Sequence, residues 1–273
     1  IGGGLIGLAS GMYLLLNGRI AGISGIVGGL LGRGGNDPGS ATFERLAFVI
    51  GLIAGPLFLL IASPITATSL VTSPMPIIVI GGLLVGFGTT LGSGCTSGHG
   101  ICGLSRFSTR SLVVHGGRFC NRACHPPSDR GPVMRIFVSL LCGAIFGAGL
   151  YISGMIDPQK VLGFLDIWAI ADGGWDPSLA FVMGGGLIVA IPFFQFAKNR
   201  DEALCGGKMG LPTNRRIDRK LIVGGLLFGT GWGLVGYCPG PAISALAFGQ
   251  TDTIIFVAAM LAGMVLCRVS RLN

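Results

Sequence analysis

The stretch GGLLVGFGTTLGSGC at residues 81–95 recurs as GGLLFGTGWGLVGYC at residues 224–238. Eight of the fifteen positions are identical at a constant offset of 143, and both stretches end on a cysteine, Cys95 and Cys238. The coincidence of several glycines, a leucine and the cysteine without a gap exceeds what shared glycine-rich composition explains. We interpret the match as an internal duplication that places the two cysteines at equivalent positions.

Weaker similarity between residues 5–25 and 141–163 extends the repeat to most of each half. We therefore predict a first membrane repeat at 1–114, a polar linker or disrupted helix at 115–133, and a second membrane repeat at 134–273.

The composition indicates an integral membrane protein. Hydrophobic residues make up 51% of the 273 and charged residues only 11%, whereas soluble globular proteins carry about 25% charged residues. Nothing alternates like barrel strands, and helices satisfy their own backbone hydrogen bonds in lipid, so we predict an all-α polytopic bundle. Apolar stretches occur at 46–62, 136–154, 179–197 and 254–267, with shorter glycine-rich ones at 1–16, 77–91 and 221–235.

Glycine and proline content predicts tight, interrupted helices. The chain has 50 glycines and 14 prolines, too many for a soluble helical bundle. Membrane helices use small residues to approach closely, and they tolerate breaks where they line a site.

The distribution of charge predicts opposite orientations for the two halves. Most Lys and Arg lie in 32–45, 105–135, 198–220 and 268–273, whereas 155–178 is acidic. Basic loops face the cytoplasm, so we read the net charge of +8 as loop charge and expect no nucleic-acid partner. The two cysteine-bearing segments then cross the bilayer in opposite directions, as in transporters whose inverted repeats meet at broken helices.

The two breaks predict a site for a soft anion. Gly92, Gly94 and Gly98 interrupt the first segment, and we expect Pro239 with Pro241 to end the second. Each break should expose backbone N–H groups and a helix N-terminus beside a thiol, an arrangement that suits an anion. A thiol donates weak S–H hydrogen bonds, which suit a polarizable sulfur atom better than an oxygen.

Three motifs resemble the YeeE/YedE membrane family: NGRIAGISGIVGG at 17–29, GSGCTSGHGICGLSR at 92–106, and GYCPGPAI at 236–243. The resemblance covers nearly the whole chain except about 115–133, with the part from Met134 onward resembling a half that is often encoded separately. It implies a multi-pass protein of the bacterial inner membrane that takes up thiosulfate or a related sulfur anion, handed between cysteine thiols.

Carried over to this chain, the resemblance places Cys95 in the first break and Cys238 in the second. A further cysteine of full-length thiosulfate carriers has no counterpart, since the matching stretch reads GRIAGISG. That departure leaves room for sulfide, sulfite or a persulfide as substrate. The complete set of predicted substrate-binding residues is Cys95, Cys238, Gly94, Thr96, Ser97, Gly98, His99, Pro239 and Gly240.

Several neighbouring residues allow two interpretations. His99 polarises the Cys95 thiol or caps the following helix, and Thr96 and Ser97 donate to oxyanion oxygens or act as N-caps. Cys102 is a redox partner of Cys95 or a packed thiol. Arg19 attracts the anion or marks a cytoplasmic helix end.

The segment HGGRFCNRACHPPSDRGP at 115–132 breaks the repeat. Offset 143 places 108–126 opposite the apolar segment 251–269, yet its charges are costly at membrane depth. It is a cytoplasmic linker, a zinc site made by His115, Cys120, Cys124 and His125, or the product of a shifted reading frame that replaced a helix. The last hypothesis fails if neither of the other two reading frames of the gene encodes an apolar run.

We conclude from the sequence that the chain is a transporter, with no cofactor, no metal and no catalytic residue. No nucleotide-binding GxxxxGK[ST] motif is present, so we expect transport that is passive or coupled to an ion gradient. The alternative is a sulfur-transfer subunit in which Cys95 carries a persulfide to a cytoplasmic sulfur-accepting protein. That role requires a thiol of lowered pKa that is open to the cytoplasm.

Overall fold

The computed structural model describes residues 1–32, 39–62, 71–92, 94–95, 102, 132–198, 200, 202–206, 209–210 and 218–270. Every regular element in these ranges is a helix, which confirms the predicted all-α class. The elements of the first half are α1 (Gly2–Asn17), α2 (Ile23–Leu31), α3 (Gly39–Ala62) and α4 (Met75–Leu91). Those of the second half are α7 (Pro132–Ile152), α8 (Pro158–Leu165), η2 (Ile167–Ile170), α9 (Ser178–Lys198), α10 (Arg219–Val235), α11 (Pro239–Ala245), η3 (Leu246–Phe248) and α12 (Thr251–Val269).

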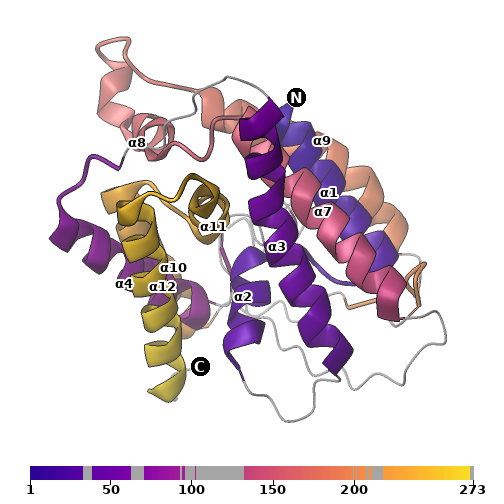
Figure 1. Cartoon of the computed structure of the whole chain (residues 1–273). Coiled ribbons are helices and arrows are strands. Elements are labelled where there is room, and N and C mark those ends of the chain that lie inside the picture. Colours follow the sequence, from indigo (N-terminus) through magenta and orange to yellow (C-terminus); the bar gives the residue numbers. More distant parts are fainter. Residues whose placement is uncertain are drawn as a thin grey trace.

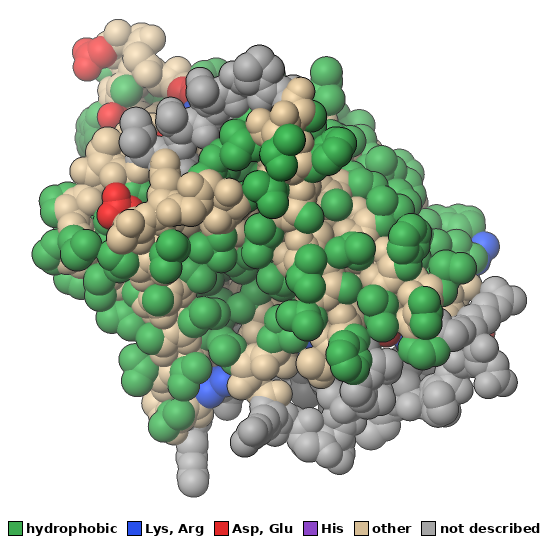
Figure 2. All heavy atoms as spheres, viewed as in Figure 1, with side chains coloured by type: hydrophobic (Ala, Val, Ile, Leu, Met, Phe, Trp, Pro, Cys, Tyr) green, Lys and Arg blue, Asp and Glu red, His purple; other side chains and the backbone are tan. Residues whose placement is uncertain are grey.

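The described helices fit a polytopic membrane bundle. Five stretches are long and apolar enough to cross a bilayer: Ala41–Ala62, Pro132–Ile152, Ser178–Lys198, Arg219–Phe248 and Thr251–Val269. The shorter helices α1 and α4 are also apolar. Large hydrophobic side chains cover much of the surface in Figure 2, as expected for a protein whose solvent is lipid. The predicted apolar segments all coincide with helices.

The helices form two packed groups with two short helices between them (Figure 1). Helices α1, α3, α7 and α9 pack together, and α4 packs between α10 and α12. The short helices α2 and α11 contact each other and members of both groups. The short helices α2 and α11 therefore bridge the two groups by contact, and Cys238 directly precedes α11.

Equivalent helices of the two halves run antiparallel. Gly81 lies against Gly231 and Gly88 lies against Gly224, so α4 and α10 cross in opposite directions. Helices α1 and α7 are antiparallel as well, because Gly2 at the start of α1 lies against Gly149 near the end of α7. Small residues such as these glycines allow helix backbones to approach this closely. This antiparallel pairing is what an inverted repeat requires, and the repeat itself stays a prediction.

The acidic residues of the 155–178 segment begin helices. Oδ1 of Asp157 accepts from the Gln159 backbone N–H at 2.9 Å, ahead of α8. Oδ1 of Asp176 accepts from the Ser178 backbone N–H at 2.8 Å, at the start of α9, and this hydrogen bond lowers the pKa of the Asp176 carboxyl. Most acidic side chains visible in Figure 2 lie near α8, and the visible basic ones lie farther down. The caps give these aspartates a structural role besides their contribution to charge asymmetry.

One face of α10 is open where the equivalent face of α4 is covered. On α4, Gly86 packs against the Met260 backbone of α12, and Gly82 packs against Ala259. The equivalent of Gly86 is Gly229, and among the described residues nothing lies within 4 Å of where its Cβ would be. The repeat predicts a helix here, equivalent to α12, from the 108–126 segment, which lies outside the described residues.

Gly86 and Gly229 make a matched pair for testing this packing. A Cβ at position 86 meets the backbone oxygen of Met260, so we expect Gly86→Ala to cost about 1–3 kcal/mol of stability through overpacking. Gly229→Ala meets no atom of the described residues and gains up to about 1 kcal/mol of helix propensity. Thermal unfolding of the two purified variants in detergent measures both effects. Equal losses in the two variants would contradict the α4–α12 contact.

Candidate functional site

Cys95 follows directly on the end of α4. The backbone N–H of Gly92 donates to the Gly88 oxygen at 2.8 Å, and that of Gly94 donates to the Thr89 oxygen at 2.9 Å. These bonds close the last turn of the helix and direct the chain away from its axis. The Cys95 side chain is 0% exposed, so the turn places a thiol in the interior of the protein.

Cys238 lies at the equivalent place after α10. This helix ends at Gly236, whose φ of 79° is a left-handed conformation that favours glycine. A Cβ at this position would also come within 2.5 Å of the Pro158 oxygen. Cys238 then has extended backbone, with φ −110° and ψ 166°, and directly precedes α11. Its side chain is 6% exposed.

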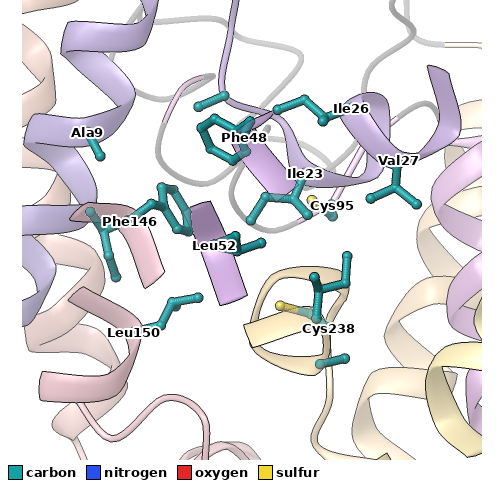
Figure 3. Packing of buried hydrophobic residues seen from close by; sticks show 14 of the residues in the cluster. Ala9, Ile23, Ile26, Val27, Phe48, Leu52, Cys95, Phe146, Leu150 and Cys238 are labelled. Carbon is teal, nitrogen blue, oxygen red and sulfur yellow. The ribbon is translucent and has the colours of Figure 1, made fainter. Parts of the chain in front are cut away.

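Both cysteines belong to the apolar core that runs through both helix groups, and Figure 3 shows them in the same part of that core. Ile23 of α2 lies beside Cys95, and Leu52 of α3 lies in the cluster with both thiols. Gly240 of α11 approaches α2 so closely that a Cβ there would be 2.8 Å from Cδ1 of Ile23. The first turns of α2 and α11 therefore meet next to the thiols.

Three polar side chains fix α11 and the residues before it. Ser244 Oγ donates to the Leu52 oxygen at 3.1 Å, which ties α11 to α3. The hydroxyl groups of Tyr237 and Thr253 are 3.3 Å apart, and the Tyr237 ring packs on Phe256 with centroids 5.4 Å apart. Cys238 is thus held between two buried anchor points.

The structure corrects the expectation that Pro239 and Pro241 end a helix. The helix ends earlier, at Val235, and Pro239 is the first residue of α11. Proline suits this position because its fixed φ is helical and its missing N–H has no helical partner there.

The described residues of the two breaks offer fewer backbone donors than the sequence suggested. The N–H of Gly94 is already bonded to Thr89. Among the first three residues of α11 only Gly240 has an N–H, because Pro239 and Pro241 lack one. The chemistry that the described part of the site offers is therefore dominated by the two thiols and the apolar side chains around them.

Four predicted residues of the first break, Thr96, Ser97, Gly98 and His99, lie outside the described residues, and so do His115, Cys120, Cys124 and His125 of the zinc hypothesis. Within the described ranges, no three His, Cys, Asp or Glu side chains gather in a way that could hold a metal ion. Cys102 is fully buried in the same core as Cys95.

A buried charged cluster that the sequence did not predict lies at the basic end of α3. Glu44 is 1% exposed, and its carboxylate lies 3.2 Å from Nε of Arg135 and 3.7 Å from Nε of Arg19. The available signal was spacing: Glu44, Phe48 and Leu52 follow at intervals of four, which places them on one helix face. The prediction instead assigned Glu44 to a basic loop.

Relatives of the chain are proteins named as transporters. A 133-residue alignment, 49% of this chain and 88% of the relative, is 45% identical to a "Probable transporter" of Xylella fastidiosa strain Temecula1. Another protein of that name from the same strain is 51% identical over 114 residues, 42% of this chain and 80% of the relative. A "Probable transporter" of Xylella fastidiosa strain 9a5c is 45% identical over 133 residues, which are 49% of this chain and 89% of the relative. No solved structure matches the chain.

A family model matches residues 134–272, which are half of the chain and carry the Cys238 break. The chain therefore belongs to the family of unknown function DUF6691.

Proposed function

We propose that the chain is a bacterial inner-membrane transporter for a small sulfur-containing anion, thiosulfate in the first place. The observation that carries the proposal is the position of the two thiols. Cys95 and Cys238 come from equivalent positions of two halves, each follows the end of a helix, and both are buried in one apolar cluster. The names of the relatives support transport as the general function.

The chemistry of the cluster favours a soft anion. A buried thiol is a weak donor and a polarizable group, so it contacts the terminal sulfur of thiosulfate at little desolvation cost. A hard oxyanion entering the same apolar surroundings would lose its hydration without gaining equivalent hydrogen bonds. Gly240 and the first-break residues Thr96, Ser97, Gly98 and His99 are proposed to supply the donors for the oxygens.

The antiparallel crossing of α4 and α10 supports a pathway between the breaks. In transporters with inverted repeats, the substrate site lies where the broken helices of the two halves meet. Here Cys95 lies beside Ile23 of α2, and Gly240 of the second break packs against the same Ile23. We propose that thiosulfate passes from one cysteine to the other across this junction of α2 and α11.

Sulfur transfer to a cytoplasmic partner is the competing hypothesis, and the burial of the thiols argues against it. A persulfide carrier must present its sulfur to the partner protein, whereas Cys95 is fully buried. Mass spectrometry of the purified protein distinguishes the two. A stable persulfide adduct on Cys95 would favour sulfur transfer, and its absence in an actively transporting protein would favour relay.

Growth on thiosulfate tests the proposed function. We expect the chain to let a bacterium that lacks its own thiosulfate and sulfate uptake systems grow with thiosulfate as sole sulfur source. The reason is that the thiol relay admits the anion without needing a second subunit. Growth on cysteine controls for general health, and uptake of radiolabelled thiosulfate into cells gives the rate. A well-expressed chain that admits no label would contradict the proposal.

A further inference from the structure

Three charged side chains from different parts of the fold meet at the basic end of the bundle. Arg19 follows α1, Glu44 lies on α3, and Arg135 lies on the first turn of α7. Nε of Arg135 is 3.2 Å from one carboxylate oxygen of Glu44, and Nε of Arg19 is 3.7 Å from the other. The exposed fractions of the two arginine side chains are 28% for Arg19 and 16% for Arg135. We call these three residues the charge triad.

The break between α1 and α2 places Arg19 in the triad. Helix α1 ends at Gly18, whose φ of 69° reverses the chain. Asn17 braces the turn because its Nδ2 donates to the Arg135 oxygen at 3.1 Å and to Ser139 Oγ at 2.7 Å. An Arg135 guanidinium nitrogen donates back to the Asn17 oxygen at 3.4 Å. Arg135 is thus held partly by a contact that does not involve Glu44, and the turn at Gly18 sets the backbone position of Arg19.

The triad carries more positive charge than its carboxylate neutralises. Two guanidinium groups face one carboxylate, so one unit of positive charge is left over. The contacts to Glu44 are also poor hydrogen bonds, because neither carboxylate oxygen accepts one within the described part of the chain. A guanidinium has five N–H donors, and among the described residues that of Arg19 contacts Glu44 alone. A loosely held, positively charged and partly exposed cluster of this kind is suited to exchange its carboxylate for an incoming anion.

The triad lies in line with the thiols. Glu44, Phe48 and Leu52 share one face of α3, and Phe48 and Leu52 belong to the apolar cluster that contains Cys95 and Cys238. Eight helical residues separate Glu44 from Leu52, which corresponds to about 12 Å along the axis. Arg19 is four residues from Ile23, which lies beside Cys95. The segment from the end of α1 to the start of α2 therefore contributes Arg19 to the triad and Ile23 to the surroundings of Cys95.

We propose that the charge triad is an anion-binding site at the mouth of the pathway, in which Glu44 occupies the arginines while no anion is bound. This inference rests on the proposed function and extends it to a second site. The ligand class is a small divalent anion whose oxygens bind the guanidinium groups after its sulfur has left the thiols, because the basic end of the bundle is predicted to face the cytoplasm, where uptake ends. Glu44 would then keep the two arginines paired between transport events and prevent an uncompensated buried charge.

Charge-neutralising variants of the triad give opposite predictions for anion affinity. We expect Arg19→Gln to weaken binding of thiosulfate and sulfate at least about tenfold, the loss typical of a charge-assisted contact. We expect Glu44→Gln to tighten binding of both anions, because the competing carboxylate is gone. Equilibrium binding of each radiolabelled anion to purified protein in detergent measures the affinities. Arg45→Gln is the matched control, since Arg45 donates to the Gly29 oxygen at 3.3 Å instead of joining the triad.

A purely structural triad would give a different pattern. Both variants would then lose thermal stability, and neither would change its anion affinity, which would overturn the inference. Size-exclusion profiles check that the variants are folded, and Arg19→Lys, which keeps the charge, is the second variant if Arg19→Gln does not fold. We expect the affinity of Arg19→Lys to lie below that of wild type, because an ammonium group lacks the forked donors of a guanidinium. Wild-type affinity in both folded variants, Arg19→Lys and Glu44→Gln, would also overturn the site.

The outcome separates this inference from the proposed function. If removing the thiols stops uptake but the triad variants bind both anions like wild type, the triad inference fails and the transport proposal stands. If wild type binds sulfate through Arg19 but neither binds nor carries thiosulfate, the triad site stands and the proposed substrate is wrong.

Discussion

Cells expressing Cys95→Ala or Cys238→Ala will take up thiosulfate roughly 10- to 100-fold more slowly than cells expressing wild type, because each thiol supplies a contact to the anion that alanine cannot replace, worth about 1.5–3 kcal/mol. The two side chains are buried in one cluster, so the anion has no water to substitute for the lost contact. Initial rates of radiolabelled uptake, normalised to the amount of protein in the membrane, measure the effect.

Cys267→Ala is the control for this prediction. Cys267 is a buried thiol on α12 that belongs to no helix break, and its removal should leave uptake near the wild-type rate. Alkylation of wild type should also block uptake, provided that the reagent reaches the cluster. Undiminished uptake in the Cys95→Ala, Cys238→Ala double variant would contradict the relay.

Gly240→Leu will stop uptake while leaving the protein folded. A Cβ at this position lies 2.8 Å from Cδ1 of Ile23, so a leucine side chain fills the junction of α2 and α11 between the two breaks. The atom it meets is the end of a flexible side chain, which can move aside, and this limits the cost in stability. Uptake and the yield of monodisperse protein are measured together.

Gly233→Leu is the matched control, because no atom of the described part of the chain lies within 4 Å of a Cβ at that position on α10. It should change neither uptake nor yield. If Gly240→Leu folds and transports like Gly233→Leu, the α2–α11 junction is not on the pathway.

Much of the fold was predictable because long apolar runs leave few alternatives. The segments 46–62, 136–154, 179–197 and 254–267 all coincide with helices, since backbone in a membrane satisfies its hydrogen bonds most simply as a helix. The glycines of the repeat were predicted to allow close approach, and Gly81, Gly88, Gly224 and Gly231 do lie at the α4–α10 crossing.

The details of the breaks were harder to predict because they depend on cap geometry. Glycine spacing indicates an interruption of the helix, but it does not show which carbonyl oxygen accepts a hydrogen bond from each backbone N–H. The bond from Gly94 to Thr89 closes α4 and removes a donor that the sequence had offered to the anion. Proline is equally ambiguous, since it ends one helix or begins another, and at Pro239 it begins α11.

The charge triad was invisible because its three members are far apart in the chain. Arg19, Glu44 and Arg135 each flank an apolar run, and a rule based on loop charge assigns all three to the aqueous surface. The structure brings them together because α1, α3 and α7 pack side by side. The spacing of Glu44, Phe48 and Leu52 indicates a shared face of α3, but it does not show which side chains of other helices meet that face.

Selenosulfate, in which selenium replaces the terminal sulfur of thiosulfate, tests the central claim most directly. The soft atom then scatters anomalously and can be located in crystals of the protein soaked with the anion. The account predicts a selenium peak in van der Waals contact with Sγ of Cys95 or Cys238. A peak elsewhere, in a protein that transports selenosulfate and binds it in solution, would contradict the account.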